Sequence, residues 1–129
     1  MSLLPPTLAD LDIMAQKALA TIPQELMRHL GAVVIRIEEF PDEETEKEMG
    51  LESPFDLLGL YRGVALPHQS VSSPRAGIDM IFLYRRPILD YWVETSEDLY
   101  TIVRHVLIHE IGHHFGFSDE DMERLENEA

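Results

Sequence analysis

The amino-acid sequence predicts a mixed arrangement of helices and strands, of the α/β or α+β class, built around one long central helix. An amphipathic helical pattern over residues 7–21 is followed by a β-branched run over residues 32–39, so a helix leads directly into a strand. Residues 97–115 are apolar nearly all round, which is typical of a buried central helix. With 129 residues and 45% hydrophobic content, the chain is expected to form one domain over residues 1–129.

The first elements carry recognisable boundary signals. Thr7 and Asp10 resemble a capping box, with Asp in place of the usual Glu or Gln, at the start of the helix over residues 7–21. Pro23 suits the first turn of a short second helix that ends near His29. The segment 41–50 has Pro at its start, acids in its first turn and Gly at its end, and is predicted to form one or two exposed helical turns.

The middle of the chain predicts two further strands, Leu57–Tyr61 and Ile78–Tyr84. The irregular segment between them is rich in Pro, Ser and Gly and is interpreted as a lip over a cleft. Pro87 is predicted to open a short turn of helix. Thr95 and Ser96 are then predicted to cap the long helix, which runs to about Phe115.

The most informative stretch is HEIGHHFGFSD, which begins at His109. On a helix, His109 and His113 stack on one face about 6 Å apart along the axis, so that they can clamp one metal ion. Glu110 lies on the same side, where a carboxylate can take a proton from metal-bound water. Gly116 is expected to end the helix and turn the chain back, so that Asp119 can supply a third ligand. Three protein ligands leave a fourth position open for water, which is the arrangement of a catalytic zinc.

Helical geometry also assigns the neighbouring histidines. Glu110 and His113 fall on the apolar stripe of the long helix, with His109 at its margin. His105 is not expected to be a ligand, because it lies about 12 Å along the axis from His113. His114 points about 100° away from His113 and is interpreted as a core, substrate-side or outer-shell residue.

Composition excludes several classes of function. The chain has no cysteine, so it has neither disulfides nor a thiolate metal site. Its 24 acidic and 10 basic residues give a net charge of −14, which disfavours nucleic acid and anionic membrane surfaces as partners. No signal peptide or membrane-spanning run is recognised, so a cytoplasmic protein is expected.

The motif HEIGHHFGFSD, together with the strand–loop–strand before it, resembles the small stand-alone zincin-like domains of bacteria that are described as zinc metallopeptidases. Its spacing is also similar to that of snapalysin, an aspartate-ligated member of the metzincin group. The resemblance implies an α+β fold, with a small, mostly three- to four-stranded sheet packed on a central active-site helix and an N-terminal helix. It implies one zinc ion on His109, His113 and Asp119, with Glu110 as general base and acid. Metzincins also carry a methionine-containing turn, whereas Met122 is assigned here to a terminal helix.

The predicted activity is therefore zinc-dependent hydrolysis of a peptide or protein substrate. The donor that stabilises the oxyanion is left open among several side chains, namely Tyr61, His68, Tyr84, Tyr91, Tyr100 and His114. One alternative is a non-catalytic zinc-binding or protein-interaction module, which would hold its metal in a closed four-ligand site. Another is a metal-dependent RNA nuclease, although nucleases with a similar zinc site lack the glutamate after the first histidine. The oligomeric state is not predicted.

Overall fold

Three strands form the sheet in the part of the chain that the computed structural model describes, which is residues 4–24, 27, 33–63, 79–116 and 118–128. The strand order is β1-β3-β2, with β1 parallel and β2 antiparallel to the central β3. The strands are β1 (Val33–Glu38), β2 (Gly59–Arg62) and β3 (Asp79–Tyr84). This mixed sheet and its helices give the α+β fold that the sequence predicted.

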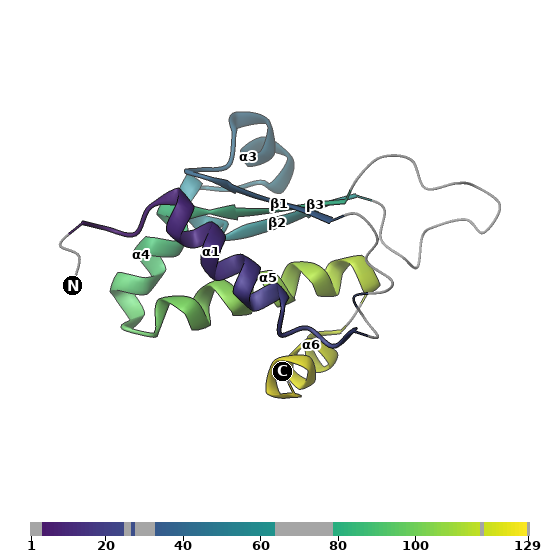
Figure 1. Cartoon of the computed structure of the whole chain (residues 1–129). Helices are drawn as coiled ribbons and strands as arrows, with labels where there is room; N and C mark the ends of the chain where they lie inside the picture. The colour runs from purple at the N-terminus through teal and green to yellow at the C-terminus, as the bar shows by residue number, and fades with distance from the viewer. Residues whose placement is uncertain (1–3, 25–26, 28–32, 64–78, 117, 129) are drawn as a thin grey trace.

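The helices cover both faces of the sheet (Figure 1). In that view α4 and α5 lie below the strands, α1 crosses on the same side, and α3 lies above. The helices are α1 (Leu8–Leu19), α3 (Glu43–Met49), α4 (Arg85–Thr95), α5 (Leu99–Phe115) and α6 (Asp119–Glu128), and the short 3₁₀ helix is η1 (Pro54–Asp56).

The long helix α5 is the centre of the packing. It contacts α1 on one side and β2 and β3 on the other, as the sequence predicted. The apolar side chains of α5 are fully or nearly fully buried, including Val103, Leu107, Ile108 and Ile111 at 0% exposure, whereas Thr101, His105 and His113 are exposed. Tertiary burial of this apolar surface stabilises the helix, because each buried aliphatic side chain contributes about 1.5–3 kcal/mol.

Local capping explains where the N-terminal elements begin and end. The Thr7 side chain accepts from the Asp10 N–H at 3.1 Å, and the Asp10 carboxylate accepts from the Thr7 N–H at 2.9 Å, which completes the predicted capping box. Asp42 caps α3 by accepting from the Thr45 N–H at 2.7 Å. Gly50 ends α3 with a left-handed φ of 63°, as its place in the sequence predicted.

The predicted start of the long helix was wrong. Ser96 ends α4 in a left-handed conformation, with a φ of 59°, and does not cap α5. The hydroxyl of Thr95 bonds the Tyr91 carbonyl inside α4 at 2.9 Å. Asp98 caps α5 instead, accepting from the Thr101 N–H at 3.1 Å. Glu97 therefore lies in the connection between the two helices, outside the first turn of α5.

Other boundaries shift by smaller amounts. The predicted strand from Leu57 begins two residues later, because Leu57 still caps η1. Helix α4 is longer than the short turn expected at Pro87. The predicted short helix ending near His29 and the irregular segment before Ile78 fall largely or wholly outside the described residues. Within the described ranges, no helix is long and apolar enough to cross a membrane.

The contact between β2 and α5 depends on Gly59. A Cβ atom at Gly59 would lie 2.6 Å from Val106 Cγ1 and 3.1 Å from the Phe82 carbonyl oxygen. The Glu110 side chain passes just beyond, with its Cγ 3.5 Å from the same point. The absence of a side chain at this strand position therefore lets β2 lie directly against the part of α5 that carries Glu110.

We expect Gly59→Ala to lower the free energy of unfolding by about 1–3 kcal/mol, because the added methyl overpacks the contact with Val106. Urea denaturation measures this cost. The same substitution in a Val106→Ala background should be less destabilising, because the clashing Cγ1 is gone. Equal costs in the two backgrounds would contradict the proposed contact.

Candidate metal centre

The candidate site lies in the last turns of α5. His109, Glu110 and His113 all belong to this helix, which ends at Gly116 with a left-handed φ of 71°. The Gly116 N–H bonds back to the carbonyls of Gly112 and His113, so the chain leaves the helix abruptly. The turn that the sequence predicted at Gly116 is therefore present in the backbone.

The two motif histidines come together at the helix surface. Their ring centroids are 4.8 Å apart, with an angle of 67° between the ring planes. Two imidazoles bound tetrahedrally to one zinc at about 2.0–2.1 Å would place their centroids about 5 Å apart. The pair is thus already close to the spacing that a shared zinc ion requires.

The exposure of the histidines differs from the sequence prediction. The His113 side chain is 47% exposed, although it was placed on the apolar stripe, whereas His109 is half-buried. A helical wheel gives the direction of a side chain around the axis and does not show where the covering elements end. The candidate site is therefore accessible to solvent on the His113 side.

Glu110 is buried between α5 and β2. Its side chain is 7% exposed, and the backbone N–H of Tyr61 donates a hydrogen bond to its carboxylate. Burial raises the pKa of Glu110 to about 6, while the neighbouring His109 and the Tyr61 hydrogen bond oppose the rise. A carboxyl group in this range can both accept and donate a proton near neutral pH.

One oxygen of Glu110 has no hydrogen bond from the described residues. Oε1 is buried, and its neighbour His113 Nδ1 lies 3.1 Å away without the angle of a hydrogen bond. A buried carboxylate oxygen without a donor is unfavourable by about 1–3 kcal/mol or more. The orphaned atom faces the histidine pair, so the position suits a group that would bring a proton to it, such as a water on a bound metal.

The third predicted ligand is only partly located. Asp119 is the first residue of α6, three residues after the Gly116 turn, but its side chain lies outside the described part of the structure. The same holds for the side chain of His114. Among the described residues no group of three metal-binding side chains is found. Met122 lies in α6, in agreement with its assignment to a terminal helix.

His105 extends the row of histidines by one turn. Its ring centroid lies 6.4 Å from that of His109. A cavity of about 260 Å³ runs beside this row and is bounded on its far side by Leu57, Leu58 and Gly59. His109 and Glu110 also line the cavity, so it opens directly onto the candidate site.

Sequence reasoning missed the part that β2 plays in the site. The Tyr61 backbone N–H bonds Glu110. The Tyr61 hydroxyl, one of the candidate donors to the oxyanion, instead donates to Asp79 Oδ1 at 3.2 Å. Tyr84, another candidate, is 3% exposed. A glycine inside a strand pattern signals close backbone approach, so Gly59 was the available clue to the contact.

The chain belongs to the zincin-like metallopeptidase family. The family described as "Zincin-like metallopeptidase" matches residues 30–129, which include β1, β2 and β3 of the described structure and the whole of α5. A comparison with curated proteins gives no match. The family assignment agrees with the resemblance found in the motif and indicates a zinc peptidase that acts on peptides or proteins.

Burial of Glu110 predicts that the stability of the metal-free protein decreases as the pH rises and this carboxyl group becomes charged. The raised pKa means that the folded state favours the neutral carboxyl group. Relative to a protein with the charged group, this contribution to the free energy of unfolding is fully present below pH 4.5 and is lost as the pH rises through about 6. The shift is equivalent to roughly 2 kcal/mol. Glu110→Gln stays neutral, so without metal it should be more stable than wild type by about this amount at pH 8, and equally stable near pH 4.

Urea denaturation at the two pH values, in the presence of a chelator, measures this difference. Glu94→Gln is the matched control because it removes the same charge from an exposed position. It should change stability by no more than about 0.5 kcal/mol. Equal stability of wild type and Glu110→Gln at pH 8 would show that the carboxylate is not buried as described.

Proposed function

We propose that this protein is a zinc-dependent peptidase in which Glu110 is the acid–base group of peptide-bond hydrolysis. The observation that carries the proposal is the buried Glu110 carboxylate, whose Oε1 lacks a donor and faces two imidazoles at zinc-binding spacing. Membership of the zincin-like metallopeptidase family supports the same reaction class.

His109, His113 and Asp119 would hold a single zinc ion. The spacing of the imidazole rings supports the first two, and the left-handed turn at Gly116 supports the third by returning the chain toward the helix end. A zinc ion bound there supplies a Lewis acid that polarises the scissile carbonyl and makes water acidic enough to react near neutral pH.

Glu110 performs the proton transfers. Its Oε1 accepts a proton from the attacking water, and the resulting carboxylic acid donates that proton to the nitrogen of the leaving amine. In the metal-free protein, burial already raises the pKa of Glu110 to about 6, which brings proton uptake and release by this carboxyl group close to neutral pH. The Tyr61 N–H fixes the carboxylate from the strand side, which restricts its orientation during the cycle.

The substrate would be a peptide or a protein segment in extended form. The cavity beside His109 has room for a few side-chain atoms, at about 260 Å³, and runs along β2 and α5. In the described sheet β2 is an edge strand, a position at which peptides can add by main-chain hydrogen bonds.

The environment of Glu110 also favours hydrolysis over the alternatives. A closed structural zinc site does not require a buried carboxyl group beside the metal ligands. Such a group destabilises the fold when it is charged. RNA cleavage is opposed by the net charge of −14.

We expect the protein purified without a histidine tag to bind about one equivalent of zinc in elemental analysis, because two imidazoles already share one face of α5. His113→Ala should weaken zinc binding by tenfold or more. His105→Ala is the matched control and should leave the stoichiometry unchanged, since His105 lies one turn outside the pair. Less than about a tenth of an equivalent under zinc-replete conditions would overturn the zinc assignment.

Glu110→Gln should retain zinc and lower peptide hydrolysis by about two to four orders of magnitude, because it keeps the side-chain shape and removes the proton acceptor. Turnover of a peptide library at matched zinc content measures the effect, with Glu94→Gln as a control that should behave like wild type. Equal cleavage by wild type and Glu110→Gln would rule out this mechanism. Loss of zinc from Glu110→Gln would instead make Glu110 a ligand.

A further inference from the structure

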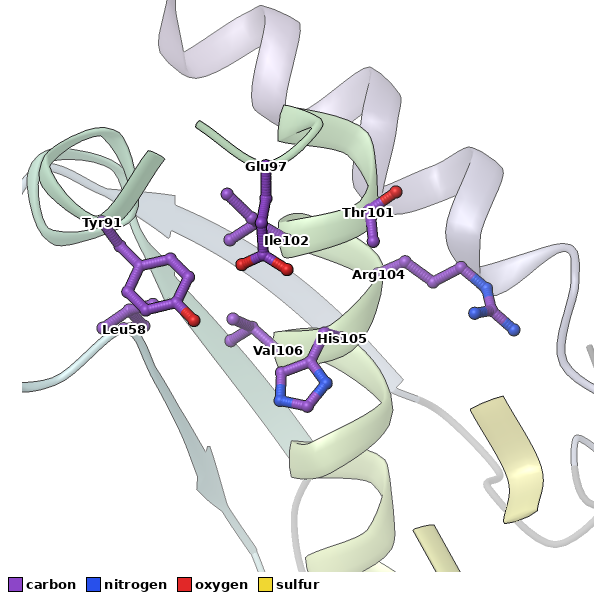
Figure 2. Close-up of a pocket in the computed structure, with 8 residues that line it drawn as sticks. All are labelled: Leu58, Tyr91, Glu97, Thr101, Ile102, Arg104, His105 and Val106. Atoms are coloured by element: carbon purple, nitrogen blue, oxygen red, sulfur yellow. The ribbon is translucent and has the colours of Figure 1, made fainter. Parts of the chain in front are cut away.

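A second hollow continues the cavity beside the candidate site. It measures about 380 Å³ and lies between α4 and the first half of α5 (Figure 2). Leu58, His105 and Val106 line both cavities. The two spaces therefore lie side by side along α5, from His109 and Glu110 toward the connection between α4 and α5, and are together called the trough.

The far end of the trough combines apolar walls with one negative charge. Leu58, Ile102 and Val106 provide aliphatic surface, and the Glu97 carboxylate extends over it from the connection between the helices (Figure 2). The Tyr91 ring lies across the hollow from α5, with its hydroxyl directed inward. An aliphatic floor below a carboxylate fits a side chain with a hydrocarbon stem and a cationic end.

No positive charge of the described chain neutralises Glu97. Among the described residues Glu97 forms no ion pair. Arg104 borders the hollow but extends to the other side of α5, where its Nε donates to the Thr21 hydroxyl at 3.2 Å (Figure 2). The carboxylate is therefore available to a cation that arrives from outside.

Tyr91 adds a second polar group to the hollow. The negative charge of Glu97 raises the pKa of the Tyr91 hydroxyl, with smaller effects from burial and from a hydrogen bond between the two side chains. Tyr91 thus keeps a neutral hydroxyl group beside the Glu97 carboxylate. Its ring also supplies a face on which a cation can rest.

The distance to the candidate site suits a peptide substrate. Thr101, at the far end of the hollow, is eight residues before His109, which is about 12 Å along a helix. An extended peptide rises about 3.3 Å per residue, so this corresponds to three or four residues of backbone. A long side chain that extends toward Glu97 covers part of this distance and reduces the number of backbone residues to about two.

We propose that this hollow is a substrate subsite in which Glu97 binds a cationic group of the peptide, two to four residues from the scissile bond. The cation is the ammonium or guanidinium group of a Lys or Arg side chain, or the N-terminal ammonium group of the peptide. The inference rests on the proposed peptidase function and adds a specificity to it. The net charge of −14 favours the approach of cationic peptides to the protein as a whole.

Hydrolysis of matched peptides by the zinc-loaded protein tests the subsite. One set has an acetylated N-terminus and carries Lys or the uncharged isostere norleucine at each position in turn. The wild type should prefer Lys at one position by about three- to tenfold in kcat/KM, the range between an exposed ion pair and a charged hydrogen bond. Glu97→Gln should abolish this preference while retaining kcat/KM for the norleucine peptides, and Glu97→Lys should invert it.

Glu94→Gln is the matched control, since it removes an exposed acid one turn from Tyr91 that does not line the hollow. It should retain the full preference for Lys. A second peptide set, with a free N-terminus and no Lys, distinguishes the two sources of the cation. If the N-terminal ammonium group is the ligand, these peptides are cut at a fixed distance from that end, and acetylation or Glu97→Gln removes the effect.

A preference for cations that Glu97→Gln leaves unchanged, or the absence of any preference in peptides that are cleaved, would overturn the subsite. If the wild type cleaves no peptide, the peptidase proposal fails and binding decides the subsite separately. Fluorescence anisotropy with the same labelled peptides should then show tighter binding of the cationic peptide by the same factor, lost in Glu97→Gln. Equal affinity for Lys and norleucine peptides would reject it.

Discussion

The burial of the Glu110 carboxylate between α5 and β2 is the constraint on which the rest of the site depends. A charged group in this position is unfavourable, and its pKa rises to about 6 as a result. The structure tolerates the buried carboxylate because the Tyr61 backbone donates a hydrogen bond to it. Gly59 makes this bond possible, since the absence of a side chain lets the strand approach the helix. The same close approach leaves one carboxylate oxygen facing the histidine pair.

The central helix joins structural and chemical roles along its length. Its apolar side chains are buried against α1 and the sheet, which fixes its position, and its last turns carry His109 and His113 to the edge of the packed region. A trough follows the helix from this edge back to Glu97. The residues proposed for metal binding, proton transfer and substrate selection thus lie on α5 or next to its two ends, with Asp119 at the start of α6 and Glu97 in the connection before α5.

The sequence predicted the features that local chemistry determines. The capping box at Thr7, the end of α3 at Gly50 and the turn at Gly116 each follow from a few neighbouring residues. The start of α5 was misplaced because Thr95, Ser96 and Asp98 are all of residue types that cap helices, and only the fold selects Asp98. The Tyr61 contact with Glu110 and the trough that reaches Glu97 join segments far apart in the sequence, so no local pattern except the glycine at position 59 pointed to them.

X-ray absorption fine structure at the zinc edge tests the central claim most directly, because it counts the imidazole ligands of the bound metal. The paired rings on α5 predict two imidazole nitrogens at about 2.0–2.1 Å from zinc, with oxygen ligands completing a four-coordinate site. A spectrum with fewer than two imidazoles, or one that fits only oxygen ligands, would contradict a catalytic zinc beside Glu110.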